Sequence, residues 1–154
     1  MPMVVGLISD THGLLRPEAV EQLRGVDRII HAGDVGRIEI LAALRSIAPV
    51  TAVRGNVDSG PCSILPVRET VEVSGHRIHV IHDLDDLDPD EHVAAVIFGH
   101  THKPVVKEVD GVLYVNPGSA GPRRFSLPIS LARLTVTPEG LRAELIEIVP
   151  NAPS

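Results

Sequence analysis

The first 53 residues alternate short apolar segments with helical segments, and this alternation constrains the fold more than any other feature. Apolar runs rich in Val and Ile predict buried strands at residues 3–8, 27–32 and 50–53. Helices are predicted between them, at residues 18–23 after Pro17 and at residues 38–47 before Pro49. This order of strands and helices predicts a parallel sheet with right-handed crossovers, and therefore an α/β fold.

The second half of the chain changes to hairpins. Three pairs of strands are predicted around short turns, at residues 68–73 and 77–81, 105–109 and 112–115, and 129–136 and 141–148. One more buried strand is predicted at residues 93–98. With about 150 residues per domain as a guide, we expect residues 1–149 to form one domain and residues 150–154 to form a frayed C-terminal tail.

A side chain that can bind a metal follows most of the predicted strands. These residues are Asp10, His12, Asp34, Asn56, His82, His100 and His102. Ligands of open α/β sheets bind outside the carboxyl ends of the strands, so the seven side chains converge there if their strands lie in one sheet or in two facing sheets.

Two carboxylates, one amide and four imidazoles are too many ligands for one tetrahedral ion, but they suit two ions that share a carboxylate. Mixed nitrogen and oxygen ligands without thiolate favour manganese, iron, nickel or zinc over calcium or magnesium. Two neighbouring ions can activate a water and stabilise the attacking and leaving oxygens of a phosphoryl displacement. The sequence therefore predicts hydrolysis of a phosphate ester.

Five short blocks carry a resemblance to a known family. They are, in order, Asp10-Thr11-His12, Gly33-Asp34, Gly55-Asn56, a lone His82, and Gly99-His100-Thr101-His102. This ordered set resembles the calcineurin-like metallophosphoesterase superfamily. The chain length, the run Gly55-Asn56-Val57-Asp58 and the run Asn116-Pro117-Gly118-Ser119 are more similar to its small branch, the YfcE-type phosphodiesterases.

The resemblance implies a four-layer αββα sandwich of two mixed β-sheets flanked by helices. It implies that Asp10, His12 and His102 hold one divalent metal ion, that Asn56, His82 and His100 hold the other, and that Asp34 bridges the two. We expect a metal-bridging hydroxide to attack a phosphodiester in line, with Asp34, Asn56 and His100 as the catalytic residues. Manganese is the favoured metal, with nickel, zinc, iron and magnesium as alternatives.

Two positions depart from the family pattern. Larger members have a His after the motif Asn that is thought to protonate the leaving group, whereas this chain has Val57. A diester with a good leaving group is therefore favoured as substrate. Many relatives have Gly after the lone His, whereas this chain has Asp83, whose carboxylate either approaches the metals or faces solvent.

Two other functions stay open. One is phosphomonoester hydrolysis, which differs in the charge and leaving group of the substrate. The other is a non-catalytic interaction module, because the retromer subunit with this fold serves as a scaffold and has a degraded metal site. The intact set of ligand residues favours the enzyme.

Three other residues have two alternative roles each. His31 either packs in the core or supports a ligand from behind. Arg123 and Arg124 either bind a substrate phosphate or are solvated. The remaining histidines are expected at the surface or in hairpins, outside the site: His76, His79 and His92.

Composition and charge limit the partners and the location. The formal net charge of −6 is the wrong sign for nucleic acid, and no run is long enough to cross a membrane. The lone Cys62 and an N-terminus without secretory features indicate the cytoplasm. We expect a small phosphate-ester substrate as the partner, and exposed hairpin edges could pair in a homodimer.

Overall fold

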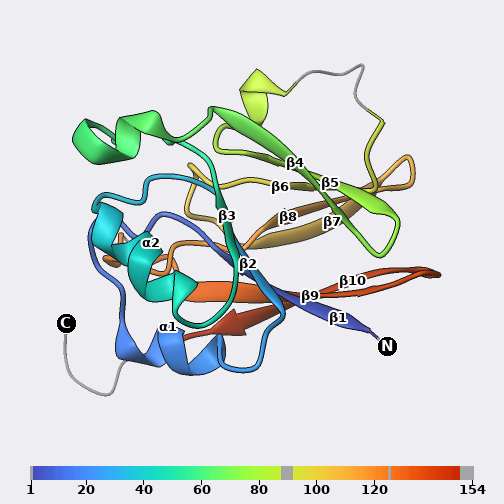
Figure 1. Ribbon diagram of the computed structural model, residues 1–154, viewed down its shortest axis with the longest axis horizontal. Helices are drawn as coiled ribbons and strands as arrows, with labels where there is room; N and C mark the ends of the chain where they lie inside the picture. Colours follow the sequence, from blue (N-terminus) through green and yellow to red (C-terminus); the bar gives the residue numbers. More distant parts are fainter. Residues whose placement is uncertain (1, 88–91, 125, 150–154) are drawn as a thin grey trace.

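Two five-stranded sheets pack face to face in the protein (Figure 1). The computed structural model describes residues 2–87, 92–124 and 126–149. The first sheet has the strand order β10-β9-β1-β2-β3, and the second has the order β4-β5-β6-β8-β7.

The first sheet joins the predicted parallel unit to the last hairpin of the chain. Its strands are β1 (Met3–Ile8), β2 (Arg28–His31), β3 (Val50–Ala52), β9 (Ser130–Thr137) and β10 (Gly140–Glu147). β1, β2 and β3 run parallel to one another, whereas β9 is antiparallel to both β1 and β10. The sheet is therefore mixed, and its three parallel strands end at the same edge.

Helices α1 (Pro17–Gln22) and α2 (Ile38–Arg45) connect the parallel strands. Both lie on one face of the first sheet (Figure 1). Pro17 begins α1 because its fixed φ suits the first helical turn. In α2, the apolar side chains of Leu41 and Leu44 are fully buried in one cluster with Ile8 and Ile29 of the sheet. The large apolar side chains of α2 thus lie on the face that packs against the sheet, as in an amphipathic helix.

The second sheet combines two hairpins with a parallel strand between them. It contains β4 (Arg68–Val73), β5 (His76–Ile81), β6 (Ala95–Ile97), β7 (Val105–Val109) and β8 (Val112–Asn116). β6 runs parallel to β5 and β8, while β4 and β7 are antiparallel to their neighbours. The 3₁₀ helix η1 (Gly60–Ile64) lies between β3 and β4 in the chain.

The core between the sheets comes from the alternate residues of the strands that face inward. Leu7 and Ile30 of the first sheet pack in one cluster with Val80 and Ile97 of the second, and each is at most 1% exposed. Burying a side chain of this size stabilises the fold by about 1.5–3 kcal/mol. This cluster fixes the two sheets relative to each other.

The outer face of the second sheet has a thinner cover. Val96 and Tyr114 on this face form a cluster with Leu84 of the 3₁₀ helix η2 (Leu84–Asp86) and with Leu87. Among the described residues, η2 is the only helical element packed on this face.

The observed elements agree with the predicted ones to within one or two residues at most ends. The expected α/β sandwich of two mixed sheets is confirmed. The predicted tail at residues 150–154 lies outside the described residues, as do residues 88–91. In the described parts of the chain, no helix has the length and apolar character needed to span a membrane.

Candidate metal centre

The predicted site residues follow strands of both sheets. Asp10 and His12 follow β1, Asp34 follows β2, and backbone hydrogen bonds hold the two segments together. The N–H of Asp10 donates to the carbonyl of Gly33 at 3.0 Å, and the N–H of His12 donates to the carbonyl of Asp34 at 2.9 Å. In the second sheet, the N–H of Gly99 donates to the carbonyl of His82 at 3.0 Å. Backbone hydrogen bonds alone thus hold these strand ends side by side.

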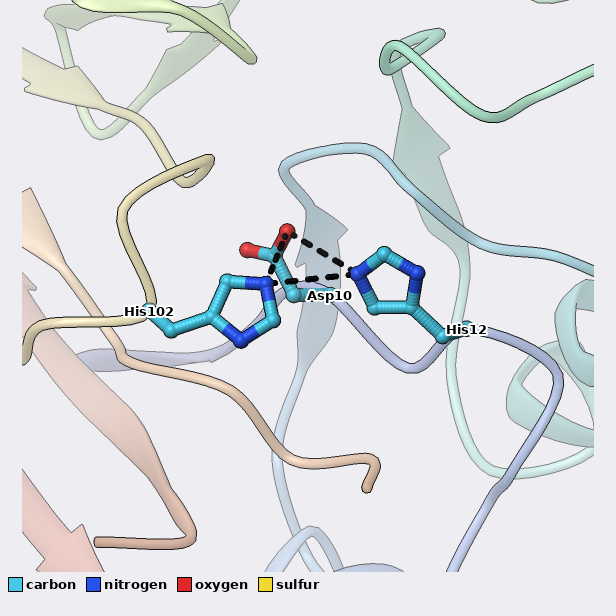
Figure 2. A group of neighbouring side chains, drawn as sticks. All are labelled: Asp10, His12 and His102. Atoms are coloured by element: carbon cyan, nitrogen blue, oxygen red, sulfur yellow. Dashed lines mark hydrogen bonds and ion pairs between the residues drawn. The ribbon is translucent and has the colours of Figure 1, made fainter. Parts of the chain in front are cut away.

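Three side chains form a first group of candidate ligands (Figure 2). Oδ1 of Asp10 lies 3.6 Å from Nε2 of His12 and 3.4 Å from Nε2 of His102. The two Nε2 atoms lie 3.3 Å apart. Three donor atoms therefore converge on one point from two loops that are about 90 residues apart in the chain.

A second group contains Asp10, Asp34 and His82. Nε2 of His82 lies 3.1 Å from Oδ2 of Asp34 and 3.9 Å from Oδ1 of Asp10. Oδ2 of Asp34 is also 3.6 Å from Nε2 of His12, a member of the first group. Both carboxylates therefore face histidines of both groups. Asp10 occupies the central position together with Asp34, which was the residue expected there.

The two oxygens of the Asp10 carboxylate have different environments. Oδ2 accepts a hydrogen bond from the Ser9 hydroxyl at 2.6 Å and from the N–H of His100 at 3.2 Å. Oδ1 is buried and has no hydrogen-bond partner. Burial alone would raise the pKa of Asp10, but the facing imidazoles of His102 and His12 and the Ser9 hydroxyl lower it far below its usual range. The result is an ionised carboxylate with one oxygen free to bind a cation.

His82 is oriented in the same way. Its Nδ1–H donates to the carbonyl of Ala32 at 2.8 Å, which leaves the lone pair of Nε2 directed toward the carboxylates. Nε2 is buried without a hydrogen-bond partner. Burial opposes protonation, but Asp34 and Asp10 outweigh it and raise the pKa of His82. Either a proton or a metal cation would satisfy this arrangement.

These buried atoms fit a divalent metal ion. Oδ1 of Asp10 and Nε2 of His82 are buried without hydrogen-bond partners, and leaving such atoms unsatisfied costs about 1–3 kcal/mol each. Their mixture of oxygen and nitrogen suits manganese, iron, nickel or zinc. The chain thus presents ligands whose burial is most easily explained by a bound cation.

Asn56 and His100 lie at the rim. Both are exposed, and His100 belongs to neither of the two compact groups of carboxylates and histidines. Asn56 lines a hollow of about 180 Å³ together with His82 and Asp83. The ring of His100 packs edge-on against that of His82, with centroids 5.4 Å apart. His100 is therefore a neighbour of the second group, and Asn56 lies beside His82 in the wall of the hollow.

The candidate ligands share an unusual backbone conformation. Five of the seven have φ between +46° and +74°, namely Asp10, His12, Asp34, His100 and His102. The only other described non-glycine residues with positive φ are Ser74 and Asp110, each placed before the glycine of a hairpin turn. Asp and His tolerate this region better than most residues, yet it costs energy. Strain is thus concentrated at the loops that present these side chains.

Two glycines allow the strand ends to approach one another. A Cβ on Gly55 would overlap the backbone and carboxylate of Asp34, and a Cβ on Gly99 would overlap the hydroxyl of Ser9. Only glycine permits these approaches without displacing Asp34 or the Ser9–Asp10 pair.

Asp58 supports the loop that carries Asn56, a role that the sequence analysis missed. Its side chain is nearly buried and accepts hydrogen bonds from the N–H of Gly36 at 3.0 Å and of Gly55 at 2.9 Å. In the same loop, the N–H of Val57 donates to Oδ1 of Asp34 at 3.0 Å. The run Gly55-Asn56-Val57-Asp58 contains this residue, but its spacing alone does not indicate the hydrogen bonds to Gly36 and Gly55.

Asn116 supports the loop that carries His100 and His102. Its amide donates to the carbonyl of Gly99 and to the Thr101 hydroxyl, both at 3.1 Å. Its oxygen accepts a hydrogen bond from the N–H of Gly118 at 2.9 Å. All the hydrogen-bonding atoms of this buried amide are therefore used to shape the loop.

His31 is fully buried, and its ring connects two ligand-bearing loops. Nδ1 accepts a hydrogen bond from the N–H of Gly33 at 3.1 Å, so Nε2–H is left to donate to the Thr11 hydroxyl at 3.0 Å. That hydroxyl donates to the carbonyl of Val35 at 2.8 Å. Burial lowers the pKa of His31 to about 4. His31 is thus a neutral core histidine that also supports the site.

The other histidines lie outside the site. His76 and His79 belong to β5, and His92 is exposed. His79 is only 1% exposed and pairs with the Thr70 hydroxyl at 3.0 Å, so it is a buried hairpin residue rather than a surface one. The guanidinium of Arg123 donates to the carbonyl of Leu127 at 3.3 Å, and the side chains of Arg123 and Arg124 are exposed.

The chain is similar in sequence to known phosphoesterases. A family model for a calcineurin-like phosphoesterase superfamily domain matches residues 3–139. A probable metallophosphoesterase of Methanocaldococcus jannaschii is 38% identical over 95% of this chain and 82% of its own length. A phosphodiesterase of the same organism is 29% identical over 75% of this chain and 83% of its own length.

A solved structure with a similar fold is named for protein sorting and not for phosphoesterase activity. The structure of Vacuolar Protein Sorting 29 from Cryptosporidium parvum superposes with a TM-score of 0.77 and 21% identity, covering 96% of this chain and 98% of that one. At this identity the likeness concerns the fold alone.

Proposed function

Because the chain belongs to the calcineurin-like phosphoesterase superfamily, we propose that it is a dinuclear metal-dependent phosphodiesterase acting on a small phosphate-ester substrate. The observation that carries this proposal is the pair of ligand groups that meet at Asp10 and Asp34. The phosphodiesterase name of one relative favours diesters. We expect the protein to act in the cytoplasm.

The residues divide into two sets around the carboxylates. Asp10, His12 and His102 would hold one ion, and Asn56, His82 and His100 would hold the other. Asp34 would contact both ions, since its Oδ2 faces a histidine of each set. Manganese is the favoured metal, with nickel, zinc, iron and magnesium as alternatives.

Bound in pairs, such ions lower the pKa of water and neutralise phosphate oxygens during an in-line displacement. The chain's own residues would contact the phosphate and balance the charge of the ions. Asn56 and His100, exposed at the rim, are the candidates to contact the phosphate. Asp34 and Asp10 bring negative charge that keeps both ions close together.

The position of Val57 limits the substrate. Its side chain is 50% exposed at the rim and has no proton to give to a leaving group. Esters whose leaving group departs without protonation are therefore favoured, which supports activated or diester substrates.

The test is hydrolysis of bis-p-nitrophenyl phosphate by metal-stripped protein, with Mn²⁺, Ni²⁺, Zn²⁺ or Mg²⁺ restored one at a time. Asp34→Asn should lower kcat/KM by about a hundredfold or more, because both ions lose a charged ligand. Asp110→Asn is the matched control, since this substitution makes the same chemical change in an exposed hairpin turn.

Metal-dependent turnover that is lost in Asp34→Asn and kept in Asp110→Asn would support the proposal. Full metal content and full rate in Asp34→Asn would refute the shared position of Asp34. Two bound ions per chain without turnover of any phosphate ester would favour a non-catalytic binding role, the alternative that the fold shared with Vacuolar Protein Sorting 29 suggests.

A further inference from the structure

The hollow beside the second ligand group has room for one ester substituent of a bound phosphate. It has a volume of about 180 Å³, and both Asn56 and His82 line it. Asp83, Asp86 and Arg54 bring the charged groups of its wall. A phosphate contacted by Asn56 therefore lies next to these charges.

The carboxylate of Asp83 is held in place on the site side of this hollow. Its Oδ1 accepts a hydrogen bond from the N–H of Asp85 at 3.0 Å and so caps η2. Its Oδ2 lies 3.9 Å from Nε2 of His100. The side chain is 28% exposed, so solvent screens its charge only in part. Capping thus fixes a negative charge beside two of the residues that would contact the phosphate.

The positive charge of the hollow does not cancel this carboxylate. The guanidinium of Arg54 donates to the carbonyl of Ser63 at 3.2 Å, which ties it to η1. Asp86 adds a second carboxylate to the wall. The wall therefore carries two negative charges and one positive charge.

We propose that Asp83 is a specificity-determining residue that favours monoanionic phosphodiesters over dianionic phosphomonoesters at this site. The inference rests on the proposed function and names the charge class of its substrate. A phosphomonoester above about pH 6 carries a second negative charge that a diester lacks. Because both charges are on oxygens of one phosphorus, the second charge adds directly to the repulsion from Asp83.

The test is Asp83→Asn, which removes the charge and keeps the shape. An asparagine oxygen can still accept the hydrogen bond from Asp85 and cap η2. We expect the ratio of kcat/KM for bis-p-nitrophenyl phosphate to kcat/KM for p-nitrophenyl phosphate, measured at pH 8, to fall about tenfold. The effect should shrink at high salt, because ions screen the repulsion. Asp85→Asn removes an exposed charge from the same 3₁₀ helix and should leave the ratio unchanged.

A binding measurement separates selection from chemistry. By calorimetry on the manganese-loaded protein, Asp83→Asn should bind inorganic phosphate about tenfold more tightly, while the affinity for dimethyl phosphate changes by less than about threefold. An unchanged substrate ratio would overturn the inference. So would a loss of manganese, or a loss of diester turnover that grows as the leaving group becomes more basic, because these would make Asp83 a support for His100 or a proton donor. Absence of turnover in the unmodified protein would instead refute the proposed function.

Discussion

Replacing His31 with glutamine should make the metal-free protein less sensitive to acid. His31 is fully buried and neutral, with its pKa lowered to about 4, whereas a histidine in the unfolded chain has a pKa of 6.5. As the pH falls below 6.5, the unfolded chain binds a proton at this position that the folded protein does not accept. Stability from the neutral ring is therefore complete above pH 6.5 and is lost as the pH falls toward 4.

The size of the effect follows from this difference in pKa. At pH 5 most unfolded chains carry the proton, while only about a tenth of the folded molecules do. The free energy of unfolding should therefore drop by about 2 kcal/mol between pH 7.5 and pH 5 through His31 alone. Because the ring is completely buried, solvent does not weaken this contribution.

The assay is urea denaturation of the chelator-treated protein at both pH values. A glutamine amide can donate to Thr11 in place of Nε2, but the N–H of Gly33 loses its acceptor. At pH 7.5 the variant should be less stable by about 1–3 kcal/mol. At pH 5 this deficit should be smaller by about 2 kcal/mol, since the variant has no ring to protonate.

Two more variants secure the interpretation. In His31→Asn, the amide oxygen can accept from the N–H of Gly33, but the hydrogen bond to the Thr11 hydroxyl is lost. Its stability should fall as little between pH 7.5 and pH 5 as that of His31→Gln, although a different hydrogen bond is missing. His92→Gln removes an exposed histidine and should keep the acid response of the unmodified protein. A stability deficit of His31→Gln that is equal at pH 7.5 and pH 5 would refute the reasoning.

Two further predictions concern the backbone of the site. Gly99→Ala should lower the free energy of unfolding by about 1–3 kcal/mol and reduce manganese affinity, because the new Cβ overlaps Ser9 and lies 2.6 Å from Oδ2 of Asp10. Gly140→Ala is the control for denaturation and metal titration, since nothing lies within 4 Å of its Cβ, and equal effects in both would contradict the prediction. Asp58→Asn should also cost about 1–3 kcal/mol in urea denaturation, because one amide oxygen cannot replace both acceptors for Gly36 and Gly55. Unchanged stability would show that Asp58 does not hold this loop.

The strands and their polar ends could be predicted because both depend on local patterns. Apolar runs followed by polar turn residues locate β1, β2 and β3, and the rule for parallel strands brings Asp10 and Asp34 together. The gathering of His82 and His102 with these carboxylates needed the second sheet, which only the family resemblance supplied.

Other features depend on contacts between distant residues. The hydrogen bonds of His31 to Thr11 and of Asn116 to Gly99 join positions 20 and 17 residues apart, and no pattern in the sequence predicts them. Likewise, the exposure of His100 and the burial of His102 differ although the two are neighbours in one loop. Their surroundings are set by how the sheets pack, and this is invisible in the local sequence.

The left-handed backbone of five candidate ligands has a consequence for the history of such a chain. Each non-glycine residue in that conformation costs about 1 kcal/mol or more, and glycine would relieve this cost. A lineage that no longer needs the chemistry can therefore replace these residues and gain stability while the two packed sheets persist. If the proposed reactivity is the function of this chain, mutational drift would remove it more easily than the fold, and Asp and His would persist at these positions only under selection for that function.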